Sequence, residues 1–150
     1  DLLEKIESSK NFQASLGILR QIEFALFDIK LHQRLYSSDE AQKLLDEIRE
    51  TTSPIEPPKY NKFQNGFSHI FSGGYAAGYY SYKWAEVLSA DAFFECLDNS
   101  GNFNKSKALG YKENILAKGN LDNMRVLYEK WLGKTPNLNN LFKLYGLESA

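Results

Sequence analysis

Residues 67–84 read FSHIFSGGYAAGYYSYKW, and they concentrate more polar chemistry than any other short segment of this chain. His69, one of only two histidines, lies near the start of the segment, and four tyrosines fill its second half. Gly73 and Gly74 lie between them, and glycine adopts backbone angles that are closed to other residues. We expect this pair to end one short helix and to begin a long one, from about residue 75 to residue 97. The rest of the chain is interpreted as a helical scaffold around the segment.

Three of the four tyrosines share one face of that expected helix. Steps of four and three residues keep Tyr75, Tyr79 and Tyr82 within roughly 60° of one another, whereas Tyr80 points to another face. A phenol brings a large apolar ring together with a hydroxyl that remains a neutral hydrogen-bond donor at pH 7. Such donors suit an oxyanion that develops during catalysis. An aromatic stripe at this spacing is also typical of simple packing, so the spacing alone leaves both interpretations open.

Hydrophobic periodicity predicts two helices before this segment. The first runs from residue 12 to about residue 36, with Asn11 as its N-cap. The second covers about residues 38–51, because its apolar positions recur at helical spacing. Ser37 and Glu40 have the spacing of a capping box, in which each side chain bonds to the backbone amide of the other residue.

The C-terminal half of the chain shows the same kind of pattern. Helices are expected at about residues 104–117 and 137–145, and between them a helix that begins at Asp122 as N-cap. Gly133 is well placed to end that middle helix in the left-handed conformation. No convincing alternating strand pattern is found. The sequence therefore predicts an all-α fold that forms a single multi-helical domain over residues 1–150.

Composition excludes several classes of partner. The 150 residues, 43% hydrophobic and 14% aromatic, suffice for a compact domain with a core. The 18 basic and 19 acidic residues are interspersed and give a net charge of -1, so we expect neither a nucleic-acid nor a membrane partner. The single cysteine, Cys96, cannot form an internal disulfide, which suits a reducing compartment. Without a membrane-spanning window or a signal-peptide pattern, the chain is expected to be soluble and cytoplasmic.

Residues 69–87, HIFSGGYAAGYYSYKWAEV, carry a resemblance to a known family, and weaker matches extend on both sides. These further matches are Arg20-Gln21, Phe24-Ala25, Asp28 and Leu31-His32 upstream, and Asp91-Ala92-Phe93, Ile115-Leu116, Gly119, Gly133, Pro136 and Gly146-Leu147 downstream. Together they resemble the C-terminal catalytic segment of the thimet oligopeptidase and oligopeptidase A family of zinc metallopeptidases. The resemblance implies that the chain is the C-terminal part of a larger, zincin-like oligopeptidase fold.

The resemblance also implies roles for individual residues. In that family, zinc and a glutamate activate water, while tyrosines and a histidine from a later segment contact the scissile peptide. By this likeness, Tyr82 and Tyr75 donate to the tetrahedral oxyanion or hold the substrate near it, and His69 contacts the substrate. The catalytic candidates are therefore Tyr82, Tyr75 and His69, and the substrate-binding candidates are Tyr79, Gly73 and Gly74. The glycines would let the loop close on a bound peptide.

The zinc-binding motif of that family is not found in this sequence. Those enzymes bind the metal through a His-Glu-x-x-His helix, a spacing that puts two imidazoles on one helix face, and through a further glutamate. This chain has only His32 and His69, and we assign no metal ligand to it. Zinc is therefore expected in the full-length enzyme but not on this chain alone. The resemblance predicts a metalloprotease that hydrolyses short peptides, and a chain that is inactive without the missing N-terminal part.

A second interpretation belongs to a different class of protein. A stand-alone or degenerate helical interaction module would use the same tyrosines as a binding patch, without catalysis. It predicts that His69 and the three phenols are buried in the domain's own core or lie on a flat surface. The enzyme interpretation predicts that they line a concavity with one side missing. A His-Glu-x-x-His motif upstream in the full-length protein would separate the two.

Overall fold

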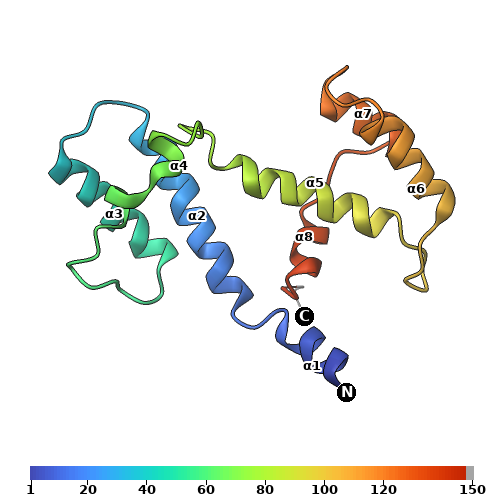
Figure 1. Ribbon diagram of the computed structural model, residues 1–150, viewed down its shortest axis with the longest axis horizontal. Helices are drawn as coiled ribbons and strands as arrows, with labels where there is room; N and C mark the ends of the chain where they lie inside the picture. The colour runs from blue at the N-terminus through green and yellow to red at the C-terminus, as the bar shows by residue number, and fades with distance from the viewer. Residues whose placement is uncertain (148–150) are drawn as a thin grey trace. The chain divides into compact units, whose positions relative to one another are not determined.

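The computed structural model describes residues 1–147, apart from the side chain of Glu7, and within this range it is all-α as predicted (Figure 1). A single antiparallel bridge joins Leu97 to Phe103, and no extended strand is formed in the described range. Contacts divide the chain into two compact units, one from Asp1 to Trp84 and one that begins at Ala85. The single folded domain remains a prediction. No helix between residues 1 and 147 combines the length and apolar character needed to cross a membrane.

The helices follow one another in both units with short connections. The helices are α1 (Leu2–Ser9), α2 (Ala14–Leu31), α3 (Ser38–Thr52), α4 (Ser68–Phe71), α5 (Ser81–Glu95), α6 (Lys105–Tyr111), α7 (Met124–Leu132) and α8 (Asn139–Leu144). A 3-10 turn at Phe63–Gly66 precedes α4, and a π-helical turn at Lys112–Leu116 follows α6.

The core of the first unit lies between α2 and α3, which pack against each other (Figure 1). Phe27 from α2 and Leu45 from α3 are fully buried there, together with Phe67 and Ile70 from the segment around α4. The predicted capping box at the start of α3 is confirmed, because Ser37 Oγ accepts from Glu40 N at 3.3 Å and Glu40 Oε2 accepts from Ser37 N at 2.8 Å. Hydrogen bonds from the backbone and side chain of Ser37 to the Glu40 carboxylate, helped by Arg34, lower the pKa of Glu40 to about 2.

Both predicted ends of the first long helix are wrong. The helix α2 begins at Ala14 and not at residue 12, and its N-cap is Gln13, which has a left-handed φ of 56° and makes no side-chain capping bond. Because a left-handed residue cannot continue a right-handed helix, the turn around Asn11 stays outside α2. At the other end, α2 stops at Leu31, where the imidazole Nδ1 of His32 lies 2.8 Å from the carbonyl oxygen of Asp28.

The second unit is held together by a buried carboxylate. Asp91 on α5 is fully buried and accepts from the Tyr128 hydroxyl on α7 and from Asn140 Nδ2, at 2.6 Å, on α8. Burial and the neighbouring carboxylate raise the pKa of Tyr128, which therefore stays a neutral donor. These bonds tie three helices to one side chain, and the apolar residues Ala92 and Leu127 pack beside them.

Two helix ends in the second unit differ from the sequence prediction. Asn123, and not Asp122, caps α7, because its side chain accepts from Arg125 N at 2.9 Å, while Gly133 ends the helix at a φ of 71° as predicted. The helix expected at 104–117 is interrupted by the π-helical turn. Asn114 Nδ2 donates to Gly110 O at 2.8 Å, which is the acceptor that the Asn114 backbone amide would use in an α-helix.

Candidate functional site

His69, Tyr75, Tyr79 and Tyr82 form one aromatic group, which we call the phenol cluster. The ring centroids of Tyr75 and Tyr82 lie 5.1 Å apart, and those of Tyr79 and Tyr82 lie 5.2 Å apart. The imidazole of His69 lies 6.0 Å from Tyr75, 6.0 Å from Tyr79 and 6.4 Å from Tyr82. All of these separations are typical of interacting aromatic pairs. The structure therefore brings the four predicted side chains together.

The helical spacing that was expected to group these side chains is wrong. The long helix expected from residue 75 begins only at Ser81, so Tyr75 and Tyr79 lie on a turn and only Tyr82 is on α5. Gly74 has a φ of +80° and Ala77 a φ of 54°, and neither value is compatible with a right-handed helix. The phenols therefore meet through a folded turn and not through helical spacing.

Asp28 on α2 holds that turn in place. Its carboxylate is fully buried, and it accepts from the backbone amide of Ala77 at 2.8 Å and from that of Tyr79 at 2.9 Å. The two oxygens each take one amide, Oδ1 from Ala77 and Oδ2 from Tyr79. The Nδ1 of His32 lies 3.0 Å from Oδ1. Because the Asp28 carboxylate accepts from both amides, neither of these two backbone donors is left without an acceptor in the turn.

Gly73 and Gly74 are required by the backbone of this turn. A Cβ atom on Gly73 would lie 2.8 Å from both the Cα and the carbonyl oxygen of His69, and Gly74 has the left-handed φ described above. The amide of Gly73 donates to Ser68 O at 2.8 Å, and the amide of Tyr75 donates to His69 O at 3.1 Å. The glycine pair thus allows the chain to fold back over His69. Its role in closing over a peptide remains a prediction.

We expect Gly73→Ala to destabilise the chain by about 1–3 kcal/mol, because the new methyl group meets backbone atoms that cannot move aside. Gly66→Ala is the matched control, since a Cβ there meets no atom within 4 Å and its φ is not positive. Urea unfolding followed by circular dichroism measures both changes. Equal stability of the two variants would contradict the close approach to His69.

The tyrosines of the phenol cluster differ in exposure. The ring of Tyr79 is half-buried against Phe24 and Phe67, and its hydroxyl donates to Gln21 Oε1 at 3.0 Å. Burial, the largest of its influences, raises the pKa of Tyr79. Tyr75 and Tyr82 are 37% and 40% exposed. A hydrogen bond to Tyr75, followed by burial, raises the pKa of Tyr82, so the Tyr82 hydroxyl is neutral at pH 7.

The supporting role of Asp28 was not predicted from the sequence. Asp28 lies on the buried stripe of α2, next to Phe27, where a charged residue is rarely found without a partner. That position could have indicated the supporting role of Asp28, because a carboxylate on an apolar helix face needs donors from elsewhere in the fold. The sequence could not show that the donors are backbone amides 49 and 51 residues away.

The described residues do not fit a zinc site of their own. Nowhere in residues 1–147 do three or more histidine, cysteine, aspartate or glutamate side chains converge in a way that could hold a metal ion. His69 is surrounded by the aromatic rings of the phenol cluster, and His32 is paired with the carboxylate of Asp28.

Comparison with known proteins identifies the family. Residues 1–147 match the model of peptidase family M3. The chain is 41% identical over 151 residues to oligopeptidase A of Escherichia coli (strain K12), an alignment that covers 99% of this chain and 22% of that protein. It is 36% identical to the organellar oligopeptidase A, chloroplastic/mitochondrial, of Arabidopsis thaliana (100% and 20% covered) and 30% identical to the dipeptidyl carboxypeptidase of Escherichia coli (98% and 22% covered).

The chain belongs to peptidase family M3, which confirms its resemblance to thimet oligopeptidase and oligopeptidase A. It spans about a fifth of the length of these relatives. The family match includes the phenol cluster and the Asp28 turn, since both lie within residues 1–147.

Proposed function

We propose that this chain is the C-terminal part of a zinc-dependent oligopeptidase, in which the phenol cluster contacts a short peptide substrate. The observation that carries the proposal is the pair of exposed phenols, Tyr75 and Tyr82, held beside His69 by a turn that a buried carboxylate fixes. Tyrosines used only for packing would be buried, whereas these two residues are more than a third exposed. Membership of a peptidase family supports the same conclusion.

Each member of the phenol cluster has a different part in this proposal. Tyr82 and Tyr75 donate hydrogen bonds to the oxyanion that forms when the scissile carbonyl is attacked, and neutral phenols are suited to this at pH 7. His69 contacts the substrate peptide beside them. Tyr79 supports the other two rings, because its own hydroxyl is already bonded to Gln21. Such donors act best when they are fixed before the reaction, and the Asp28 turn provides that rigidity.

The metal and its ligands are proposed to lie in the rest of the full-length protein, on the N-terminal side of this chain. The described residues bring no three ligands together, so we assign to this chain only substrate and oxyanion contacts. We also propose a cytoplasmic location. One Arabidopsis thaliana relative, 36% identical, is called a probable cytosolic oligopeptidase A, although another is organellar.

Measurements of peptide hydrolysis and of metal content test whether the zinc site lies outside this chain. We expect the full-length protein to cleave short peptides and to contain zinc, whereas the isolated 150-residue chain folds into helices, cleaves none and retains no stoichiometric zinc. Circular dichroism, a peptide-cleavage assay and metal analysis of chelator-free protein measure these properties. One tightly bound zinc per isolated chain would overturn the proposal. A full-length protein that binds peptides without cleaving them would favour the non-catalytic interaction module.

A further inference from the structure

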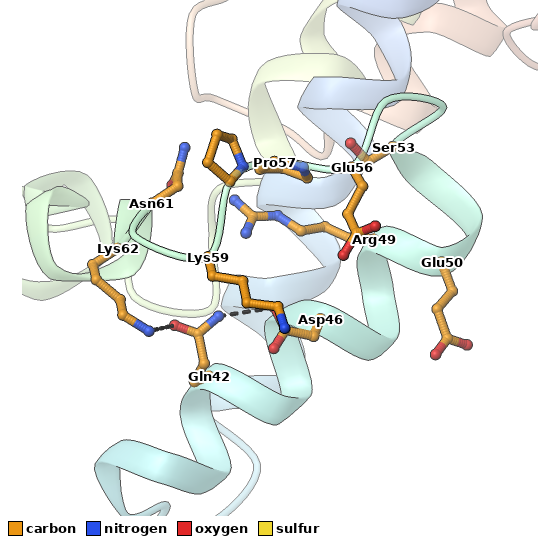
Figure 2. Close-up of a pocket in the computed structure, with 11 residues that line it drawn as sticks. Gln42, Asp46, Arg49, Glu50, Ser53, Glu56, Pro57, Lys59, Asn61 and Lys62 are labelled. Atoms are coloured by element: carbon orange, nitrogen blue, oxygen red, sulfur yellow. Dashed lines mark hydrogen bonds between the residues drawn. The ribbon is translucent and has the colours of Figure 1, made fainter.

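A polar pocket of about 570 Å³ lies between α3 and the loop that follows it, in the first unit (Figure 2). Its size is typical of sites that bind small molecules. One wall is made by α3 residues, where Gln42 donates to Asp46 at 2.8 Å and accepts from Lys62 at 2.8 Å. The loop at residues 53–62 forms the other wall and includes Lys59 and Asn61.

Arg49 is the unusual residue of this pocket. Its side chain is 8% exposed, and its Nε donates to Glu23 Oε1 at 3.0 Å. The Nη2 atom is buried and has no hydrogen-bond partner, and within residues 1–147 Glu23 is the single partner of the whole guanidinium. Figure 2 shows the guanidinium extending from α3 toward the loop that carries Pro57 and Asn61. Its two Nη groups therefore have no acceptor among the described residues, and a guanidinium can bind a carboxylate through two parallel hydrogen bonds.

A buried carboxylate beneath the pocket accepts from two guanidinium groups. Glu23 is 1% exposed, and its Oε1 accepts from Arg20 Nη1 at 2.7 Å as well as from Arg49. Two guanidinium cations thus share one carboxylate. Unused donors on a buried guanidinium such as that of Arg49 are costly, because the lost hydration is not replaced. An anionic ligand on Arg49 would supply the missing acceptors.

The rim of the pocket selects among possible anions. Lys59 and Lys62 add positive charge, whereas Asp46, Glu50 and Glu56 add negative charge. Three carboxylates disfavour a multiply charged anion such as phosphate. They favour a ligand that carries an ammonium group as well as one carboxylate.

We propose that this pocket binds a free amino acid or a short peptide as a zwitterion, with its carboxylate on the Nη edge of Arg49 and its ammonium group on the acidic side. The inference rests on the charges of the pocket and not on the proposed peptidase activity. It adds a second ligand site to the first unit, made from residues other than those of the phenol cluster.

Calorimetric titration of the full-length protein tests this site with three small probes of similar size. L-alanine carries both charges, propionate lacks the ammonium group and alaninamide lacks the carboxylate. We expect saturable binding of L-alanine and weaker binding of the other two. Arg49→Gln should lower the affinity for L-alanine by about 10- to 100-fold, as is typical when hydrogen bonds to a charged group are lost. Inorganic phosphate should bind more weakly than L-alanine.

Two lysine variants complete the experiment. Lys59→Ala, an exposed residue on the rim, should weaken L-alanine binding by about two- to fivefold without affecting folding, and it decides the question if Arg49→Gln fails to fold. Lys43→Ala, also exposed on α3 but outside the pocket, should leave binding unchanged. The proposal is overturned if L-alanine does not bind or if phosphate binds as tightly as L-alanine. It is also overturned if the Arg49 and Lys59 variants bind L-alanine with the same affinity as the unmodified protein.

Discussion

Replacing Tyr82 by phenylalanine in the full-length protein is expected to lower kcat by about 10²- to 10³-fold and to leave KM nearly unchanged. The ring and its contacts with Tyr75 and Tyr79 remain, so the fold changes little, whereas the hydroxyl donor and its hydrogen bond to Tyr75 are lost. A donor that acts mainly on the transition state affects kcat, because a contact made equally in the ground state would appear in KM. Steady-state kinetics with a short fluorogenic peptide measure both constants.

Tyr80→Phe is the matched control for this experiment. Tyr80 lies two residues away, is 49% exposed, and makes no ring contact with the phenol cluster in the described part of the chain. Its replacement should change neither kcat nor KM. Equal losses at positions 80 and 82, or normal turnover in Tyr82→Phe, would show that the Tyr82 hydroxyl is not an oxyanion donor.

Asp28→Ala is expected to destabilise the protein by about 1–3 kcal/mol, since the part-buried backbone amides of Ala77 and Tyr79 both lose their acceptor. The turn between Gly74 and Ser81 would then lose its fixed geometry. Chemical unfolding measures the loss of stability. The same variant in the full-length protein should lose peptide cleavage under conditions where it remains folded.

Two further variants show whether the loss of stability in Asp28→Ala comes from the backbone amides of Ala77 and Tyr79. Asp28→Asn keeps one acceptor oxygen, so it should lose about half as much stability, because its NH₂ group faces an amide that also donates. Asp39→Asn removes a charge from an exposed position in the first turn of α3 and should cost less than about 1 kcal/mol. If Asp28→Ala were no less stable than Asp39→Asn, the carboxylate would not hold the turn.

Local patterns in the sequence predicted the parts of the fold that local chemistry determines. The capping box of Ser37 and Glu40 and the left-handed Gly133 are formed by residues close to one another in the chain, and both are found as predicted. The all-α class follows from hydrophobic periodicity in the same way. The start of α2 was wrong because periodicity continues through Phe12, while Gln13 adopts a left-handed conformation that no pattern indicated.

Features that depend on distant contacts were not predictable. The phenol cluster was predicted with the right members, but the helix that was expected to align them is replaced by a turn, because Asp28 takes the amides of Ala77 and Tyr79. The pairing of the Arg49 guanidinium likewise depends on Glu23, which is 26 residues away on another helix. In both cases a buried charge on one helix determines the chemistry of a segment elsewhere in the first unit.

The most direct test of the central claim is a crystal structure of the full-length protein with a peptide analogue that has a tetrahedral phosphinyl group in place of the scissile carbonyl. We expect the Tyr82 hydroxyl to lie about 2.7–3.1 Å from a phosphinyl oxygen, with Tyr75 and His69 in contact with the same analogue. An analogue that binds without touching Tyr82, Tyr75 or His69 would contradict the assignment of the phenol cluster to substrate and oxyanion binding.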